Sequence, residues 1–159
     1  KLIEKLRAEI NGVTLRTSLI VGFPGETAKD FEELLSFVES ARFDRLGAFM
    51  YSREEGTPAY SMKGQVSRKT KAGRLDAVMS VQREISLESN RGFIGKPVKV
   101  LVESATDDGL KGRAPSQAPD VDGVVYVNGI DARPGDIMEV TVTDAGDYDL
   151  FAENARKTR

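Results

Sequence analysis

The stretch Leu19-Ile-Val-Gly-Phe-Pro-Gly-Glu-Thr27 decides how the first half of this 159-residue chain is interpreted. An apolar run ends at Val21, and Gly22-Phe-Pro-Gly25 predicts a turn. Thr27 with Asp30 three residues later is typical of a capped helix start. A strand, a glycine turn and a capped helix together expose backbone N–H groups where α/β folds bind anionic or nucleotide-like ligands. The stretch therefore predicts one half of a small-molecule site, with a purely structural turn as the alternative.

The flanking residues predict helix and strand in alternation. Apolar residues at helical spacing predict a first helix that Asn11-Gly12 ends, and residues 13–21 then predict a buried strand. A helix over 28–41 and a strand over 46–51 follow, as in βα repeats with parallel strands. Two strands do not make a stable sheet of this kind. We therefore expect the end of a larger α/β barrel or sheet whose earlier repeats are missing, or else a short independent α/β unit.

The second half of the chain changes period. A long helix is predicted to begin near Gln65 to Ser67 and to end near Asn90. Its basic cluster of Arg68, Lys69, Lys71 and Arg74 predicts a solvated face, with RNA contact as the alternative. From Lys96 the apolar residues alternate with polar ones, and Gly, Asp and Pro turns separate five short segments. This pattern predicts a small closed β-barrel of OB-like size.

The predicted fold class is therefore α/β followed by all-β: terminal βα units of a partial TIM-like barrel, a long connecting helix and a five-stranded OB-like barrel. The predicted domain organisation is an α/β segment over 1–64, a connecting helix over 65–91, a β-barrel over 92–153 and a basic tail over 154–159.

Composition excludes several kinds of chemistry. The chain has no cysteine and no histidine, which excludes disulfides, Cys/His zinc sites and cysteine nucleophiles. It also lacks an apolar run near the length of a membrane span, and without disulfides a cytoplasmic location is the default expectation. Residues 92–153 hold 5 Lys/Arg and 12 Asp/Glu, a net charge of −7. Such a barrel suits a basic protein partner better than a phosphate backbone, although a solvated acidic surface is the alternative.

Ordered motifs over essentially the whole chain resemble one enzyme family, the radical-SAM methylthiotransferases. The first half resembles the end of their radical-SAM domain, through Leu15 to Thr27, Arg42-Phe-Asp-Arg-Leu-Gly47 and Tyr51-Ser-Arg-Glu-Glu-Gly-Thr-Pro-Ala59. The second half resembles their TRAM domain, through Lys99 to Glu103, Gly112-Arg-Ala114, Ala118 to Val125 and Asp147-Tyr-Asp-Leu150. Within the family, the motifs at 42–47 and 54–58 resemble the branch that modifies a ribosomal protein (RimO-type), and the tRNA-modifying branch (MiaB-type) is the close alternative.

The resemblance implies methylthiolation of the β-carbon of an aspartate in a small-subunit ribosomal protein. It also implies that the TRAM domain recruits this substrate, as the free ribosomal protein or within the ribosome. It implies S-adenosyl-L-methionine and two 4Fe-4S clusters as cofactors, the clusters providing radical chemistry and methylthio delivery. The alternative is that the chain is not part of an enzyme but a non-catalytic RNA- or protein-binding module built from the same segments.

The resemblance also implies which residues border S-adenosylmethionine. The strand end and turn would face its adenosine, Phe49 to Tyr51 would form an adjacent wall, and two residues earlier in the strand would meet its polar ends. Glu26 is predicted either to cap backbone amides or to bind a ligand's ammonium or hydroxyl groups. The candidate cofactor-binding residues are therefore Arg16, Ser18, Val21, Gly22, Phe23, Pro24, Glu26 and Tyr51.

Each cluster needs cysteine thiolates, which this chain lacks. The cluster ligands are therefore expected upstream, in a longer protein, as an opening on Lys1 also suggests. The 159-residue chain alone is expected to contain no metal ligand and no catalytic residue, and to have no activity.

Overall fold

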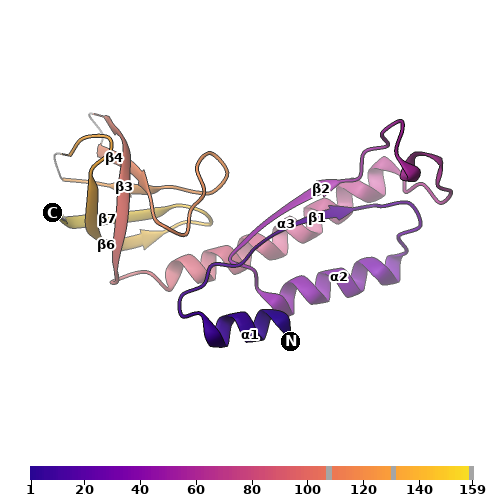
Figure 1. The fold of residues 1–159 in the computed structure, drawn as a ribbon, viewed down its shortest axis with the longest axis horizontal. Coiled ribbons are helices and arrows are strands. Elements are labelled where there is room, and N and C mark those ends of the chain that lie inside the picture. The colour runs from indigo at the N-terminus through magenta and orange to yellow at the C-terminus, as the bar shows by residue number, and fades with distance from the viewer. Residues whose placement is uncertain (107–108, 130–131, 158–159) are drawn as a thin grey trace. The chain divides into compact units, whose positions relative to one another are not determined.

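The computed structural model describes residues 1–106, 109–129 and 132–157. The chain divides into two compact units, Lys1–Ile85 and Ser86–Arg159, each of which is described by itself. The first contains parallel strands with helices and the second a closed β-barrel, so the predicted fold class, α/β followed by all-β, is confirmed (Figure 1). The predicted limits at 64/65 and 91/92 differ from this division, which falls within the long third helix.

The first unit is built around a two-stranded parallel sheet. Its register runs from Arg16 opposite Arg45 to Val21 opposite Met50. The elements, in chain order, are α1 (Leu2–Glu9), β1 (Arg16–Val21), α2 (Ala28–Ala41), β2 (Arg45–Met50), the 3-10 helix η1 (Pro58–Ser61) and α3 (Arg68–Arg91).

Strand β1 starts three residues later than predicted, at Arg16 instead of Val13. The start of β1 is set by its partner, because β2 begins at Arg45, which lies opposite Arg16 and donates its N–H to the Leu15 carbonyl at 3.2 Å. The Leu15 N–H donates instead to the carboxylate of Asp44 at 2.8 Å, and the Val13 N–H closes a turn onto the Ile10 carbonyl. Apolar character alone therefore overstated the length of the strand.

The two faces of this sheet differ in what covers them. On one face, Val21 and Leu46 pack with Val38 of α2 and Val78 of α3 in a single core. Ile20 and Phe49 are cross-strand partners on the opposite face and remain 58 % and 61 % exposed. Side chains alternate between the faces of a strand, so every second residue of this nearly continuous apolar run faces away from the core. Near the carboxyl ends of the two strands, this uncovered face therefore presents apolar side chains to solvent.

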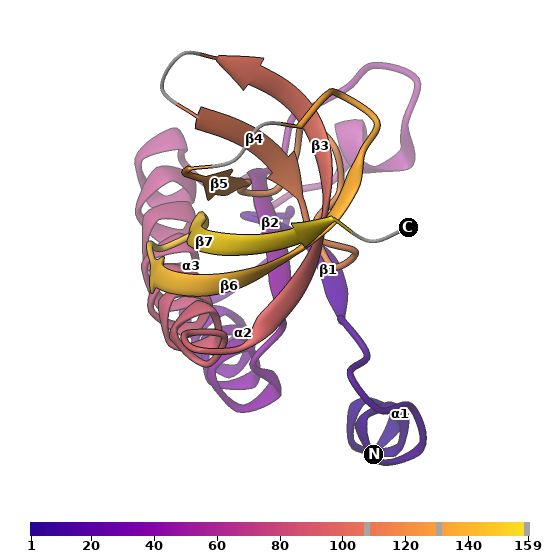
Figure 2. The same cartoon turned by 90° about the vertical axis from the view of Figure 1, so that its left-hand side faces the viewer.

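The second unit is a closed barrel with strand order β3-β4-β5-β7-β6 (Figure 2). Neighbouring strands are antiparallel except for β5 and β7, which pair in parallel. Alternate residues of each strand fill the interior, as the period of two predicts. The strands are β3 (Pro97–Thr106), β4 (Gly109–Arg113), β5 (Val125–Val127), β6 (Ile137–Ala145) and β7 (Leu150–Lys157).

The predicted basic tail at 154–159 is in part a continuation of β7. Backbone pairing with β6 places Glu139 opposite Arg156 and Met138 opposite Lys157. The tail prediction was therefore wrong for 154–157, because a ladder partner was available there, and 158–159 lie outside the described residues.

We predict that Gly112→Ala lowers the free energy of unfolding of the barrel by about 1–3 kcal/mol, the usual cost of overpacking. A Cβ at Gly112 would lie 2.3 Å from the Leu101 carbonyl oxygen, which is fixed in the neighbouring strand. Gly73→Ala is the matched control, since open space surrounds this helical position and alanine favours helix there. Chemical denaturation of the chain checks both; equal stability of the two variants would contradict the packing argument.

Candidate functional site

The carboxyl ends of β1 and β2 meet at one edge of the sheet, where residues from three segments converge. We call these residues the strand-end cluster: Gly22, Phe23 and Glu26 from the β1–α2 turn, Tyr51 after β2, and Lys71 and Arg74 from the first turns of α3. Edges of this kind are where α/β folds place their ligands. The cluster contains four of the eight residues predicted to bind a cofactor.

The Glu26 carboxylate holds the turn together from inside. Both of its oxygens accept from the Gly22 N–H, at 3.0 and 2.9 Å. The Arg74 guanidinium forms an ion pair with the same carboxylate and donates to the Glu26 carbonyl at 3.2 Å. The two side chains are only 13 % and 10 % exposed. Of the two predicted roles for Glu26, the capping of backbone amides is therefore the one its geometry serves.

Lys71 fixes the second strand end. Its ammonium group donates to the Tyr51 carbonyl at 2.8 Å and lies 4.9 Å from the centre of the Tyr51 ring. Its aliphatic stem passes so close to Gly22 that a Cβ there would lie 2.4 Å from the Lys71 Cγ. Gly22 also has a φ of +75°, which glycine adopts without strain. The predicted solvated face of α3 is thus wrong for Lys71 and Arg74, which are directed at the strand ends.

Phe23 and Tyr51 bring an aromatic pair to the same edge. Their rings lie edge to face with centroids 5.2 Å apart, and Phe23 is 42 % exposed. The Tyr51 N–H donates to the Val21 carbonyl at 2.9 Å, which continues the ladder by one step. The Tyr51 hydroxyl is buried and has no hydrogen-bond partner among the described residues. Most buried polar groups in proteins have a hydrogen-bond partner, so this hydroxyl is an exception among them.

The other predicted residues are spread over different surroundings. Arg16 and Ser18 lie in β1 on the uncovered face, in line with Ile20. The Val21 side chain is fully buried in the opposite, helix-facing core, so only its backbone lies at the edge. Pro24 is buried in the turn. The structure thus brings Gly22, Phe23, Glu26 and Tyr51 together and separates the Val21 side chain from them.

Sequence reasoning missed the part that three residues play in this region: Ile20 on the uncovered face, and Lys71 and Arg74 on α3. Phe49, on the same face as Ile20, lies within the predicted wall of residues 49–51. The alternation of side chains along β1 gives a usable signal for Ile20, because it must face opposite to Val21. No comparable signal exists for Arg74, which meets Glu26 across 48 positions of sequence.

The site offers features that suit a nucleoside-bearing cofactor but none that suits an iron–sulfur cluster. The exposed Ile20 and Phe49 side chains give an apolar surface of the kind on which a base can stack, and the buried Tyr51 hydroxyl has no hydrogen-bond partner among the described residues. Iron–sulfur clusters need thiolates, and the chain has no cysteine. Within 1–106, 109–129 and 132–157, no group of three or more acidic residues could hold a metal ion.

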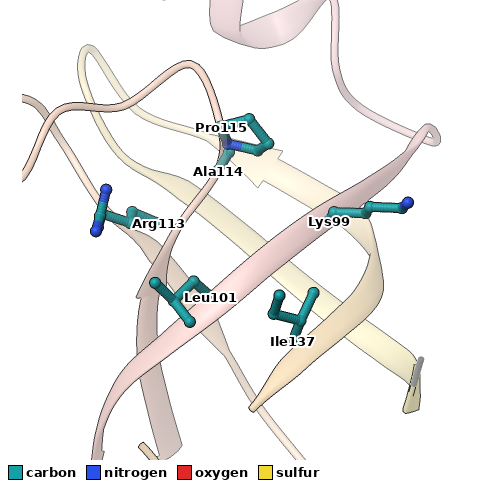
Figure 3. A pocket seen from close by; sticks show the side chains of 6 residues that line it. All are labelled: Lys99, Leu101, Arg113, Ala114, Pro115 and Ile137. Carbon is teal, nitrogen blue, oxygen red and sulfur yellow. The ribbon is translucent and has the colours of Figure 1, made fainter. Parts of the chain in front are cut away.

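The barrel has a shallow hollow of about 240 Å³ on its outer surface. Figure 3 shows Leu101 and Ile137 between Lys99 on one side of it and Arg113 on the other. Arg113 donates to the Glu103 carboxylate at 2.6 Å, so one of these two cations is already neutralised.

In the part of the chain that the structure describes, no helix has the length and apolar character needed to cross a membrane.

Comparison with known proteins finds relatives for both units. The TRAM domain family matches residues 94–154. The chain is 52 % identical over 155 residues to the ribosomal protein uS12 methylthiotransferase RimO of Geotalea uraniireducens, covering 96 % of this chain and 35 % of that protein. The protein of the same name from Trichlorobacter lovleyi is 53 % identical over 96 % of this chain and 34 % of its own length. That of Geobacter sulfurreducens is 51 % identical over 96 % and 35 %. The chain thus spans about a third of the length of these relatives.

We predict that Glu26→Leu lowers the free energy of unfolding of the first unit by roughly 3 kcal/mol, the low end of the range for breaking a buried pair. The substitution leaves the Arg74 guanidinium and the Gly22 N–H without their carboxylate. Glu33→Gln is the control, because its contact with Lys29 is solvent-exposed and contributes little. Denaturation curves for the two variants check this, and a Glu26→Leu protein as stable as the control would refute the role of the pair.

A second prediction concerns the helix cap beside the cluster. Hydrogen bonds from the backbone N–H and hydroxyl of Thr27 hold the pKa of the Asp30 carboxyl below its usual value of 3.8. The ionised cap therefore stabilises the fold above that pH and is lost as pH falls through the lowered pKa. An NMR titration should show a depressed pKa for Asp30 that rises in Thr27→Ala; an unchanged value in that variant would refute the capping contact.

Proposed function

Because the chain belongs to the radical-SAM methylthiotransferase family, we propose that it forms the last part of the catalytic barrel of such an enzyme together with its TRAM domain. The proposed reaction is methylthiolation of a small-subunit ribosomal protein at the β-carbon of an aspartate. Two considerations support this substrate: the relatives are named for ribosomal protein uS12, and the motifs at 42–47 and 54–58 resemble the branch that modifies a ribosomal protein. The full reaction is proposed for the longer protein, of which this chain represents about a third.

The observation that carries the proposal is the uncovered face of the β1–β2 sheet beside the strand-end cluster. In a closed α/β barrel, helices pack outside the strands, the opposite face looks inward, and the ligand binds at the carboxyl ends of the strands, near which Ile20 and Phe49 lie. Here α2 and α3 cover the face of Val21, while Ile20 and Phe49 line the other. This arrangement is what an interior wall of such a barrel requires.

In this proposal the chain's residues position S-adenosylmethionine, which when bound supplies the radical and methyl chemistry. Ile20 and Phe49 contact the flat adenine, and the strand end at Val21-Gly22 approaches it through backbone atoms. Ser18 and Arg16 lie further along the same face, where the polar parts of the cofactor would bind. Glu26, Lys71 and Arg74 act indirectly, by holding the Gly22 turn and the Tyr51 strand end in place.

The TRAM barrel is proposed to recruit the substrate protein. Its net charge of −7 over residues 92–153 favours a basic protein over a nucleic acid. A ribosomal substrate would place the reaction in the cytoplasm. A tRNA substrate is the second candidate, and a role as a binding module without catalysis is the third.

The two 4Fe-4S clusters would be bound by another part of the enzyme, because this chain has no thiolate to offer. The 159 residues alone are therefore expected to have no methylthiotransferase activity.

We predict that the full-length enzyme with reconstituted clusters methylthiolates the ribosomal protein and leaves tRNA unmodified. Mass spectrometry of both substrates after reaction measures this directly.

Two matched variants test the proposed cofactor wall. Ile20→Asp puts a charge on the proposed adenine wall, and Ile137→Asp changes a similarly exposed apolar position on the barrel. Ile20→Asp should raise the KM for S-adenosylmethionine at least about tenfold, given the cost of an unpaired charge in a binding site, and Ile137→Asp should not. Modification of tRNA, or equal effects of the two variants, would refute the proposal.

A further inference from the structure

The barrel presents a pair of stacked aromatic side chains to solvent. Tyr126 of β5 and Phe151 of β7 are direct cross-strand partners, with ring centroids 5.6 Å apart and planes 18° from parallel. They are 40 % and 39 % exposed. Their inward neighbours, Val125, Val127, Leu150 and Ala152, already fill the core. We call Tyr126 and Phe151 the aromatic platform.

The strands on either side of β5 and β7 are β4 and β6 (Figure 2), and each has a charged residue opposite the platform. Asp144 of β6 lies opposite Phe151, and Lys111 of β4 lies opposite Tyr126. Glu153 follows Phe151 by two residues on the same outward face of β7, and all three charged residues are exposed. The platform thus has two carboxylates on the Phe151 side and one ammonium group on the Tyr126 side.

We propose that the aromatic platform docks an arginine-bearing segment of a basic protein. A guanidinium group stacks flat on an aromatic face and pairs with carboxylates at its edge, a combination that a lysine ammonium cannot reproduce. Asp144 and Glu153 provide those carboxylates beside Phe151. The inference rests on the proposed function, because it identifies the surface of the TRAM barrel that would recruit the basic substrate protein.

Single-stranded nucleic acid is the competing occupant, because bases also stack on exposed aromatic rings. Phosphates would meet Lys111 but also two carboxylates and a barrel of net charge −7. Charge complementarity therefore favours the basic peptide. A substitution of Lys111 distinguishes the two occupants, because its ammonium group repels a basic peptide and attracts a phosphate backbone.

The experiment measures binding of three labelled probes to the whole 159-residue chain by fluorescence anisotropy. The probes are an arginine–glycine peptide, the same peptide with lysine for arginine, and a single-stranded oligouridylate. We expect the arginine peptide to bind most tightly, and Tyr126→Ala and Phe151→Ala to weaken it roughly 3- to 30-fold, as loss of a cation–π contact predicts. Lys111→Glu should tighten its binding, and Ile137→Ala, an exposed apolar control elsewhere on the barrel, should have no effect.

Two results would overturn the proposal. Tightest binding by the oligouridylate, weakened in Lys111→Glu, would identify a nucleic-acid surface. Loss of stability in Tyr126→Ala and Phe151→Ala with unchanged binding would identify a pair that serves only to join β5 to β7. The binding assay needs no iron–sulfur cluster, so it is independent of the activity assay. The peptide-binding proposal can therefore be refuted even if the full-length enzyme modifies the ribosomal protein. Modification of tRNA by that enzyme would instead count against the proposed function and leave the peptide affinities as measured.

Discussion

The ion pair between Glu26 and Arg74 is the contact on which the geometry of the first unit depends. One carboxylate binds the Gly22 N–H at the end of β1 and the guanidinium of α3, so a turn, a strand end and a helix are fixed together. Lys71, one helical turn earlier, fixes the end of β2 in the same way through the Tyr51 carbonyl. Both strand ends are thus held by one helix from the covered side, and the opposite face of the sheet stays open for a ligand.

The proposed role of the first unit in catalysis depends on that open face. Helices α2 and α3 bury one face of the two-stranded sheet. Ile20 and Phe49 on the other face do not pack in the core of this unit. In the proposed full-length enzyme, further strands would complete the barrel and enclose such a face. On that proposal the candidate site is half a pocket, and the rest of the enzyme would supply its remaining walls. The barrel unit adds a separate surface suited to a macromolecular partner.

Much of the fold follows from local patterns in the sequence. The Thr27 cap, the glycine turn and the change of period near Lys96 predicted α2, the β1–α2 turn and the barrel, because each depends on neighbouring residues. The ends of β1 and β7 were misjudged because strand ends are set by the partner strand, which local character does not reveal. The roles of Lys71 and Arg74 depend on contacts made across many intervening residues, so composition suggested a solvated face where the structure has two fixed strand ends.

The central claim is that the Ile20–Phe49 face of the sheet borders the cofactor. A structure of the full-length enzyme with S-adenosylmethionine bound tests it most directly. The account predicts van der Waals contact between the adenosine and the side chains of Ile20 and Phe49, with the Glu26–Arg74 pair intact behind the turn. A cofactor bound away from this face, or a Glu26 carboxylate that leaves Gly22 to contact the ligand, would contradict it.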